Sequence, residues 1–195
     1  MGLALKLIVG LGNPGEEYAR TRHNAGVWFL SRFAELQGVT FKLEKKFHGR
    51  TALTHFGGHE IRLLVPNTYM NESGKAVGAI SHFYRIAPEE ILIAHDELDL
   101  PTGAIRYKEG GGLAGHNGLR DVTRSLGGQQ SFNRLRIGVG HPGNKENVTG
   151  HVLGKVNKQD ESVINECIEE SLRYLPLAAD GDWQQAMTAL NGFKP

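Results

Sequence analysis

The chain has 195 residues, of which 39% are hydrophobic and 22% charged, and this composition is typical of one globular domain. Its single cysteine, Cys167, excludes an internal disulfide and any zinc site built from two or more thiolates. The longest apolar run near the start, Leu7–Leu11, is too short for a signal peptide or a membrane span. We therefore predict a cytoplasmic protein in a reducing environment, without membrane association.

Taken in chain order, the hydrophobic pattern predicts alternating strands and helices. Strands are predicted over residues 5–11, 47–56, 59–65, 91–94, 104–108 and 135–139. Helices are predicted over residues 25–36, 71–85, 118–126, 163–175 and 183–190. This alternation predicts an α/β fold: a single domain over residues 1–195 with a mixed, mostly parallel β-sheet flanked by helices on both faces. Disorder is expected, if anywhere, in residues 191–195.

Charge is unevenly distributed in the second half of the chain. Residues 101–145 carry seven Lys/Arg and two acidic residues, a net charge of +5. Residues 146–195 carry four Lys/Arg and eight acidic residues, a net charge of −4. A basic block beside an acidic one is compatible with an anionic ligand on one side of the molecule, but two ordinary solvated surfaces would give the same pattern. Charge alone leaves both interpretations open.

A glycine pattern, Gly10-x-Gly12-x-x-Gly15, follows the first predicted strand and matches the dinucleotide-binding fingerprint. A cofactor-binding helix should begin at the glycines, so that its N-terminus meets the pyrophosphate. Here Pro14 interrupts the turn and the helix does not begin until about Asn24, which is also a plausible helix cap. Nucleotide binding is therefore disfavoured, and a nucleotide-dependent oxidoreductase stays as one alternative.

Other common catalytic patterns are missing from the sequence. There is no Gly-x-Ser-x-Gly motif that would mark a serine nucleophile. Cys167 lies on the apolar stripe of a predicted helix, where a small core residue is the more common interpretation. The acidic run His95–Asp99 fits no zinc spacing. We therefore predict neither a metal nor a cofactor.

A histidine and an aspartate remain as a candidate acid–base pair. Histidine is the side chain best suited to take a proton near neutral pH, and it works best when a carboxylate holds its other ring nitrogen. His23 lies in a predicted loop, and Asp96 ends an apolar strand, where a lone carboxylate is costly. A His23–Asp96 pair would satisfy both side chains. For His23 alone, a capping or surface histidine is the more common interpretation.

Three asparagines, Asn13, Asn71 and Asn117, occupy predicted turn or cap positions. Each one alone is most simply interpreted as turn chemistry. Because an amide both donates and accepts hydrogen bonds, the three could also form a neutral rim beside His23 and Asp96.

Six ordered motifs carry a resemblance that covers nearly the whole chain. They are Gly10–Gly15 (GLGNPG), Thr21–Gly26 (TRHNAG), Pro66–Asn71 (PNTYMN) with Ser73-Gly74, His95–Asp99 (HDELD), Gly110–Leu119 (GGGLAGHNGL) and Arg134–Gly138 (RLRIG). In this order the motifs resemble the bacterial peptidyl-tRNA hydrolase family. Any one of them would be weak, but together they are highly specific.

The resemblance implies hydrolysis of the ester that joins a peptide to tRNA, with water as the nucleophile. His23 matches the general base, Asp96 the residue that orients it, and Asn13 the position that separates N-blocked peptidyl-tRNA from free aminoacyl-tRNA. The remaining matches are positions for substrate and tRNA binding: Tyr18, Tyr69, Met70, Asn71, His116, Asn117, and a basic pair for tRNA phosphate, Lys108 and Arg136.

Departures from the family pattern are small. Position 69 is Tyr, where the family carries Phe or Tyr, so an aromatic face is kept. His141 stands where many members carry Arg, which puts one phosphate contact in doubt.

Peptidyl-tRNA is therefore the expected partner of a monomeric enzyme with no obligate protein partner. A second alternative is an RNA-binding module without catalysis, which would use the basic block from Arg106 to Arg136.

Overall fold

The structure is a computed structural model that describes residues 2–195. Within these residues the strands form one seven-stranded sheet in the order β2-β3-β4-β1-β5-β7-β6. The strands are β1 (Leu7–Gly10), β2 (Lys42–Glu44), β3 (Gly49–Phe56), β4 (His59–Pro66), β5 (Ile91–Glu97), β6 (Ile105–Glu109) and β7 (Asn133–Gly138).

The sheet is mixed, and its parallel pairs lie at the centre. β1 pairs in parallel with β4 and β5, and β5 pairs in parallel with β7. The outer pairs, β2–β3, β3–β4 and β6–β7, are antiparallel. The prediction of a mixed sheet with helices on both faces is confirmed. The expected mostly parallel pairing holds for the centre alone, because antiparallel strands extend both edges of the sheet.

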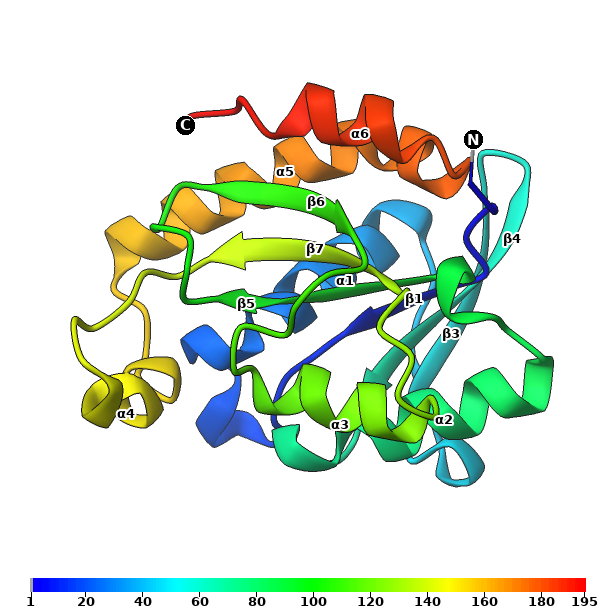
Figure 1. The fold of residues 1–195 in the computed structure, drawn as a ribbon, viewed down its shortest axis with the longest axis horizontal. Helices are drawn as coiled ribbons and strands as arrows, with labels where there is room; N and C mark the ends of the chain where they lie inside the picture. Colours follow the sequence, from blue (N-terminus) through cyan, green and yellow to red (C-terminus); the bar gives the residue numbers. More distant parts are fainter. Residues whose placement is uncertain (1) are drawn as a thin grey trace.

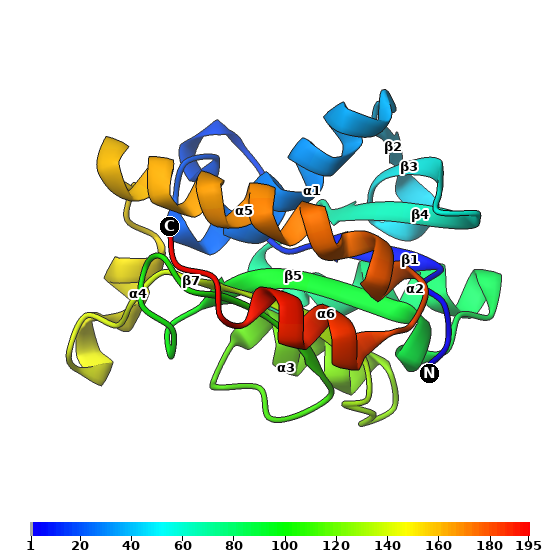
Figure 2. The ribbon, with the colours of Figure 1, turned by 90° about the horizontal axis from the view of Figure 1, so that it is seen from above.

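Helices cover both faces of the sheet, as Figure 2 shows for α1 (Ala25–Gln37) and α5 (Lys158–Ala179) on one side and α2 (Ser73–Tyr84) and α3 (Asn117–Ser125) on the other. Successive side chains of a strand point to opposite faces of the sheet, so the apolar residues of the central strands contribute to two hydrophobic cores, one on each face. Ile8 and Leu92 pack with α1, α5 and α6 (Trp183–Leu190). Val9 and Ile93 pack with α2 and α3.

The glycines after β1 allow the start of α1 to approach the sheet closely. A Cβ at Gly10 would lie 2.6 Å from the carbonyl oxygen of Gly26, and a Cβ at Gly12 would lie 2.6 Å from Val27 Cγ2. A Cβ at Gly26 would collide with the carbonyl oxygen of Ala94 in β5. Helix packing therefore accounts for Gly10 and Gly12, without a bound nucleotide.

The structure differs from the prediction in two details. The short elements β2 and α4 (Val148–Val152) were not predicted, since three or five residues show too little periodicity. Asn24 precedes α1, but its side chain makes no capping hydrogen bond to the helix. At the other end of the chain, Phe193 packs against the core that contains α5 and α6.

The central strands point toward one side of the molecule, where α4 also lies (Figure 1). The polar residues that follow these strands therefore gather at this edge, as is usual in open α/β sheets. Among residues 2–195, no helix is both long and apolar enough to cross a membrane.

Candidate active site

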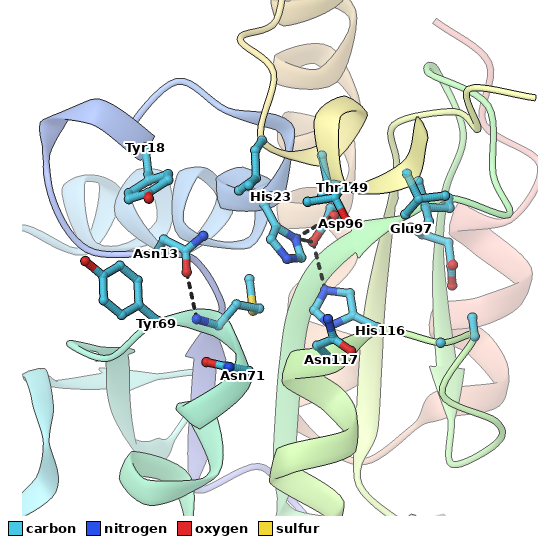
Figure 3. A pocket seen from close by; sticks show the side chains of 17 residues that line it. Asn13, Tyr18, His23, Tyr69, Asn71, Asp96, Glu97, His116, Asn117 and Thr149 are labelled. Carbon is cyan, nitrogen blue, oxygen red and sulfur yellow. Dashed lines mark hydrogen bonds and ion pairs between the residues drawn. The ribbon is translucent and has the colours of Figure 1, made fainter. Parts of the chain in front are cut away.

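Segments far apart in the sequence place polar side chains around one cavity at the carboxyl edge of the central strands (Figure 3). Asn13 follows β1, and Asp96 lies near the end of β5. His23 lies on a single 3-10 turn, η2 (Arg22–Asn24), that leads into α1, and His116 immediately precedes α3. The cavity has a volume of about 290 Å³, which admits the reacting end of a substrate and excludes a folded nucleic acid.

His23 and Asp96 are paired, as the sequence predicted. His23 Nδ1 lies 2.9 Å from Oδ1 and 2.9 Å from Oδ2 of Asp96. The side chain of His23 is 12% exposed and that of Asp96 is 1% exposed. A carboxylate at Nδ1 places the proton on that nitrogen and leaves the lone pair on Nε2. Nε2 has no hydrogen-bond partner among residues 2–195, and the ring lines the cavity.

Asp96 stays ionised despite its burial. Burial by itself would raise the pKa of the carboxyl, but electrostatic attraction to His116 and His23 and hydrogen bonds from both rings outweigh it. Together these interactions hold the pKa of Asp96 well below its usual range. The aspartate is therefore a permanent hydrogen-bond acceptor at neutral pH.

His116 is the second histidine on this carboxylate. Its Nε2 lies 2.8 Å from Asp96 Oδ1, and its ring is tilted against that of His23 with the centroids 5.1 Å apart. Its Nδ1 accepts hydrogen bonds from the backbone N–H groups of Gly118 and Leu119 at the start of α3. The sequence assigned His116 to substrate binding. It does line the cavity, but both of its ring nitrogens are occupied within the protein.

Asn13 is held by a neighbour that the sequence did not single out for this role. Its backbone N–H donates to Asn24 Oδ1 at 2.9 Å, and Asn24 Nδ2 donates to its carbonyl oxygen at 3.0 Å. Asn13 Oδ1 in turn accepts from the backbone N–H of Met70 at 2.7 Å. These bonds orient the side-chain amide of Asn13. Its Nδ2 has no hydrogen-bond partner among the described residues.

The other predicted substrate-binding residues also line the cavity. Tyr18 and Tyr69 meet edge to face, with ring centroids 6.2 Å apart and planes at 86°. Asn71 and Asn117 lie on the far side of the cavity from Tyr18 (Figure 3). Asn117 Oδ1 accepts a long hydrogen bond of 3.5 Å from Arg120, and its NH₂ group has no partner among residues 2–195.

The predicted basic pair lies outside the cavity, on the adjoining strands β6 and β7. Lys108 faces Arg134 across the two strands, and Arg106 faces Arg136, so these four residues share one face of the antiparallel β6–β7 pair. Arg136 Nε lies 2.8 Å from Glu97 Oε1, and Glu97 lines the cavity. Lys108 forms no ion pair with any residue in the described part of the chain. The basic block seen in the sequence thus places Arg106, Lys108 and Arg136 on a basic face beside the site, whereas Arg134 is buried and donates to the carbonyl oxygen of Gly110.

A family model described as peptidyl-tRNA hydrolase matches residues 7–195. The chain belongs to the peptidyl-tRNA hydrolase family. The peptidyl-tRNA hydrolase of Edwardsiella ictaluri (strain 93-146) is 55% identical over 98% of this chain and 98% of its own. That of Acinetobacter baumannii (strain AYE) is 53% identical over 98% of both chains.

Solved structures of peptidyl-tRNA hydrolases agree with the fold. The crystal structure of the Acinetobacter baumannii enzyme superposes with a TM-score of 0.96, at 52% identity, over 100% of this chain and 99% of that one. The prediction that the chain is an enzyme, a peptidyl-tRNA hydrolase, is therefore confirmed. The two alternatives, an oxidoreductase and an RNA-binding module without catalysis, are set aside.

Several cavity residues of this peptidyl-tRNA hydrolase were not predicted from the sequence. Glu97 belongs to the HDELD motif, and its position beside Asp96 was the available signal. The apolar wall had no such signal, because it is built from loop residues and from the unpredicted helix α4. This wall consists of Leu98, Val148, Val152 and Leu153.

Within residues 2–195, one group of side chains is spaced closely enough to hold a metal ion. One ligand atom each from His23, Asp96 and His116 lie within 4.8 Å of one another. Hydrogen bonds between the same atoms also account for this spacing. The predicted reaction without a metal stays a prediction.

Proposed function

We propose that this peptidyl-tRNA hydrolase cleaves the ester bond between peptide and tRNA by using His23 as a general base on water. One observation carries the proposal. Asp96 occupies Nδ1 of His23, and the free Nε2 belongs to a ring that lines the cavity. This is the arrangement required of a histidine base that an aspartate orients.

The proposed reaction proceeds in two steps. Nε2 of His23 takes a proton from water as the water oxygen bonds to the ester carbonyl carbon, and the carbonyl oxygen becomes an oxyanion. The bond between that carbon and the ribose oxygen then breaks, and Nε2 returns the proton to the ribose oxygen. The products are tRNA with a free hydroxyl and an N-blocked peptide with a free carboxyl group. No covalent enzyme intermediate is needed.

The asparagines supply neutral hydrogen bonds in this proposal. Asn71 and Asn117 line the cavity, and an amide N–H aimed at the developing oxyanion lowers the barrier. The NH₂ group of Asn13 would donate a hydrogen bond to the peptide carbonyl that precedes the ester-bearing residue. A free aminoacyl-tRNA offers an ammonium group there instead, which an amide donor repels. This contrast explains a preference for N-blocked substrates.

Aromatic and basic side chains would hold the tRNA. Tyr69 is an exposed large apolar side chain beside Tyr18, and both rings offer faces for the unpaired bases of the acceptor end. Lys108 and Arg136 would bind phosphate from the basic face of β6 and β7.

We also propose that residues 1–195 act as one monomeric, cytoplasmic domain without a metal, a cofactor or an obligate partner. The single cysteine is buried in the core and suits a reducing compartment. Light scattering of the purified protein would test whether it is a monomer. Activity after chelation by EDTA would test whether the reaction needs a metal.

Replacement of the base tests the mechanism. His23→Ala should lower peptide release from an N-acetyl-aminoacyl-tRNA by about 10²- to 10⁴-fold, because the water loses its base. The matched control is His82→Ala, which removes an exposed histidine from α2 and should leave the rate unchanged. If His23→Ala is folded by circular dichroism and still releases peptide at the full rate, the proposed mechanism is wrong.

A further inference from the structure

His116 is more constrained than a residue that only contacts substrate. Its side chain is 7% exposed, and it occupies the N-cap position of α3. Nδ1 accepts from the N–H groups of Gly118 at 3.1 Å and Leu119 at 3.3 Å, and Nε2 lies 2.8 Å from Asp96 Oδ1. The ring thus joins the amino end of a helix to the carboxylate that holds His23.

These contacts determine the tautomer of His116. A backbone N–H can only donate, so Nδ1 must carry a lone pair and no proton. Nε2 must then carry the proton of the neutral ring, and it donates this proton to Asp96. A second proton on Nδ1 would break both bonds to the start of α3, where the helix dipole also opposes a positive charge.

We infer that His116 is a positioning residue for the reaction: α3 fixes its Nε2–H tautomer, and this donor holds Asp96 as the ionised acceptor of the His23 Nδ1 proton. The inference rests on the proposed role of His23. His116 therefore acts through Asp96, and its substitution should change catalysis more than substrate binding.

The geometry of Asp96 supports a role for both histidines. Oδ1 accepts from His116 and from His23, while Oδ2 accepts from His23 alone. Without His116 the buried carboxylate would keep a single side-chain donor, and a poorly satisfied buried charge tends to rotate or to take up a proton. A protonated or rotated Asp96 would no longer hold the proton of His23 on Nδ1.

The surrounding packing keeps the His116 ring in place. A Cβ at Gly118 would lie 3.0 Å from His116 Cε1 and 2.5 Å from Met70 Sδ, so the first turn of α3 fits closely against the ring. On the other side the ring of His95 meets His116 edge to face, with centroids 5.2 Å apart. The ring has little freedom to turn toward a substrate.

The decisive variant is His116→Asn. Asparagine is a good N-cap and can accept from the start of α3, but its shorter side chain does not reach Asp96 as the imidazole does. We expect thermal stability close to that of the unmodified protein, kcat lower by about tenfold or more, and KM changed less than threefold. The control is His59→Asn, which removes a surface His–Asp contact of 2.7 Å and should change neither constant.

Nitrogen NMR of the histidine rings tests the inference without any activity. The unmodified protein should show a neutral His116 with its proton on Nε2, and His116→Asn should weaken or broaden the His23 Nδ1 proton signal. A His116 proton on Nδ1 at neutral pH would overturn the inference. So would full kcat in His116→Asn, or a rise in KM alone. If His23→Ala stays active, the proposed function fails, while the ring signals still report whether His116 orients Asp96.

Discussion

The side-chain amide of Asn24 forms two hydrogen bonds with the backbone of Asn13. Its Oδ1 accepts from Asn13 N–H, and its Nδ2 donates to Asn13 C=O. The two residues are eleven positions apart, and the contact joins the loop after β1 to the turn before α1. The side chain that looked like a helix cap instead positions a residue of the proposed substrate site.

Removal of this contact should disturb selectivity as well as stability. Asn24→Ala leaves a buried N–H and C=O unsatisfied, which should lower the free energy of unfolding by about 1–3 kcal/mol. Because Asn13 loses its support, the ratio of kcat/KM for N-acetyl-aminoacyl-tRNA over the same aminoacyl-tRNA should fall, as it should in Asn13→Ala. The control Asn165→Ala removes an exposed asparagine of α5. Unchanged selectivity in both site variants would refute the proposed role of Asn13.

Asp96→Asn should separate catalysis from binding. An asparagine has nearly the same shape, but its NH₂ group cannot accept a hydrogen bond from either imidazole, so the tautomer of His23 is no longer fixed. We expect kcat to fall by roughly 10²- to 10⁴-fold, with KM for N-acetyl-aminoacyl-tRNA nearly unchanged. Equal kcat in Asp96→Asn and in the unmodified protein would show that Asp96 does not orient the base.

Lys108→Ala should weaken tRNA binding in a salt-dependent way. Lys108 lies on the basic face of β6 and β7 and forms no ion pair with a described residue, so its charge is available to phosphate. Loss of one phosphate contact should reduce the slope of log K against log salt by about 0.7–0.9. Titration of labelled tRNA at several salt concentrations measures this slope. An equal loss of affinity at all salt concentrations would contradict a phosphate contact.

Arg136→Ala should behave differently from Lys108→Ala, because Arg136 has a structural partner. The side chain of Glu97 is 3% exposed, and removal of Arg136 leaves its carboxylate buried without a counter-ion. We expect the free energy of unfolding in urea to fall by roughly 3 kcal/mol. The double variant Glu97→Gln/Arg136→Met should recover most of this loss. A single-variant effect below about 0.5 kcal/mol would show that the pair contributes little.

His95 should make the protein sensitive to mild acid. Burial, with smaller contributions from neighbours such as His116, lowers the pKa of His95 to about 3, while an unfolded histidine titrates near 6.5. Between these values the unfolded chain binds one more proton, so the stability due to His95 is complete above about pH 6.5 and is lost as the pH falls. The slope is about 1.4 kcal/mol per pH unit.

Comparison with His95→Leu isolates this contribution. Between about pH 4.5 and 6, the free energy of unfolding should depend on pH less steeply in the variant than in the unmodified protein. The difference in slope should correspond to about one bound proton. The contribution of Asp96, whose pKa is lowered in the folded state, is lost only at more acidic pH and does not interfere. Equal slopes for the two proteins would mean that His95 is protonated in the folded state.

Local patterns predicted most of the fold. The apolar run of β1, the helix that ends at Gly38 in the left-handed conformation, the Gly57-Gly58 hairpin and α6 all appear close to their predicted bounds. These signals reside within a few neighbouring residues, so the sequence displays them directly. The short elements β2 and α4 were missed because their stability comes from packing and not from local periodicity.

The sequence by itself determined the family, the strand–helix alternation and the candidate residues, because ordered motifs and hydrophobic periods are properties of the chain alone. Only the tertiary structure decided how those residues are partnered. Asp96 lies 73 positions from His23 and 20 from His116, and no local pattern shows that one carboxylate serves both rings. The same holds for Asn24, whose amide bonds across a loop, and for Arg136, which is tied to Glu97 39 positions away. Hydrogen bonds depend on distance and direction, which are set only when the strands and helices pack.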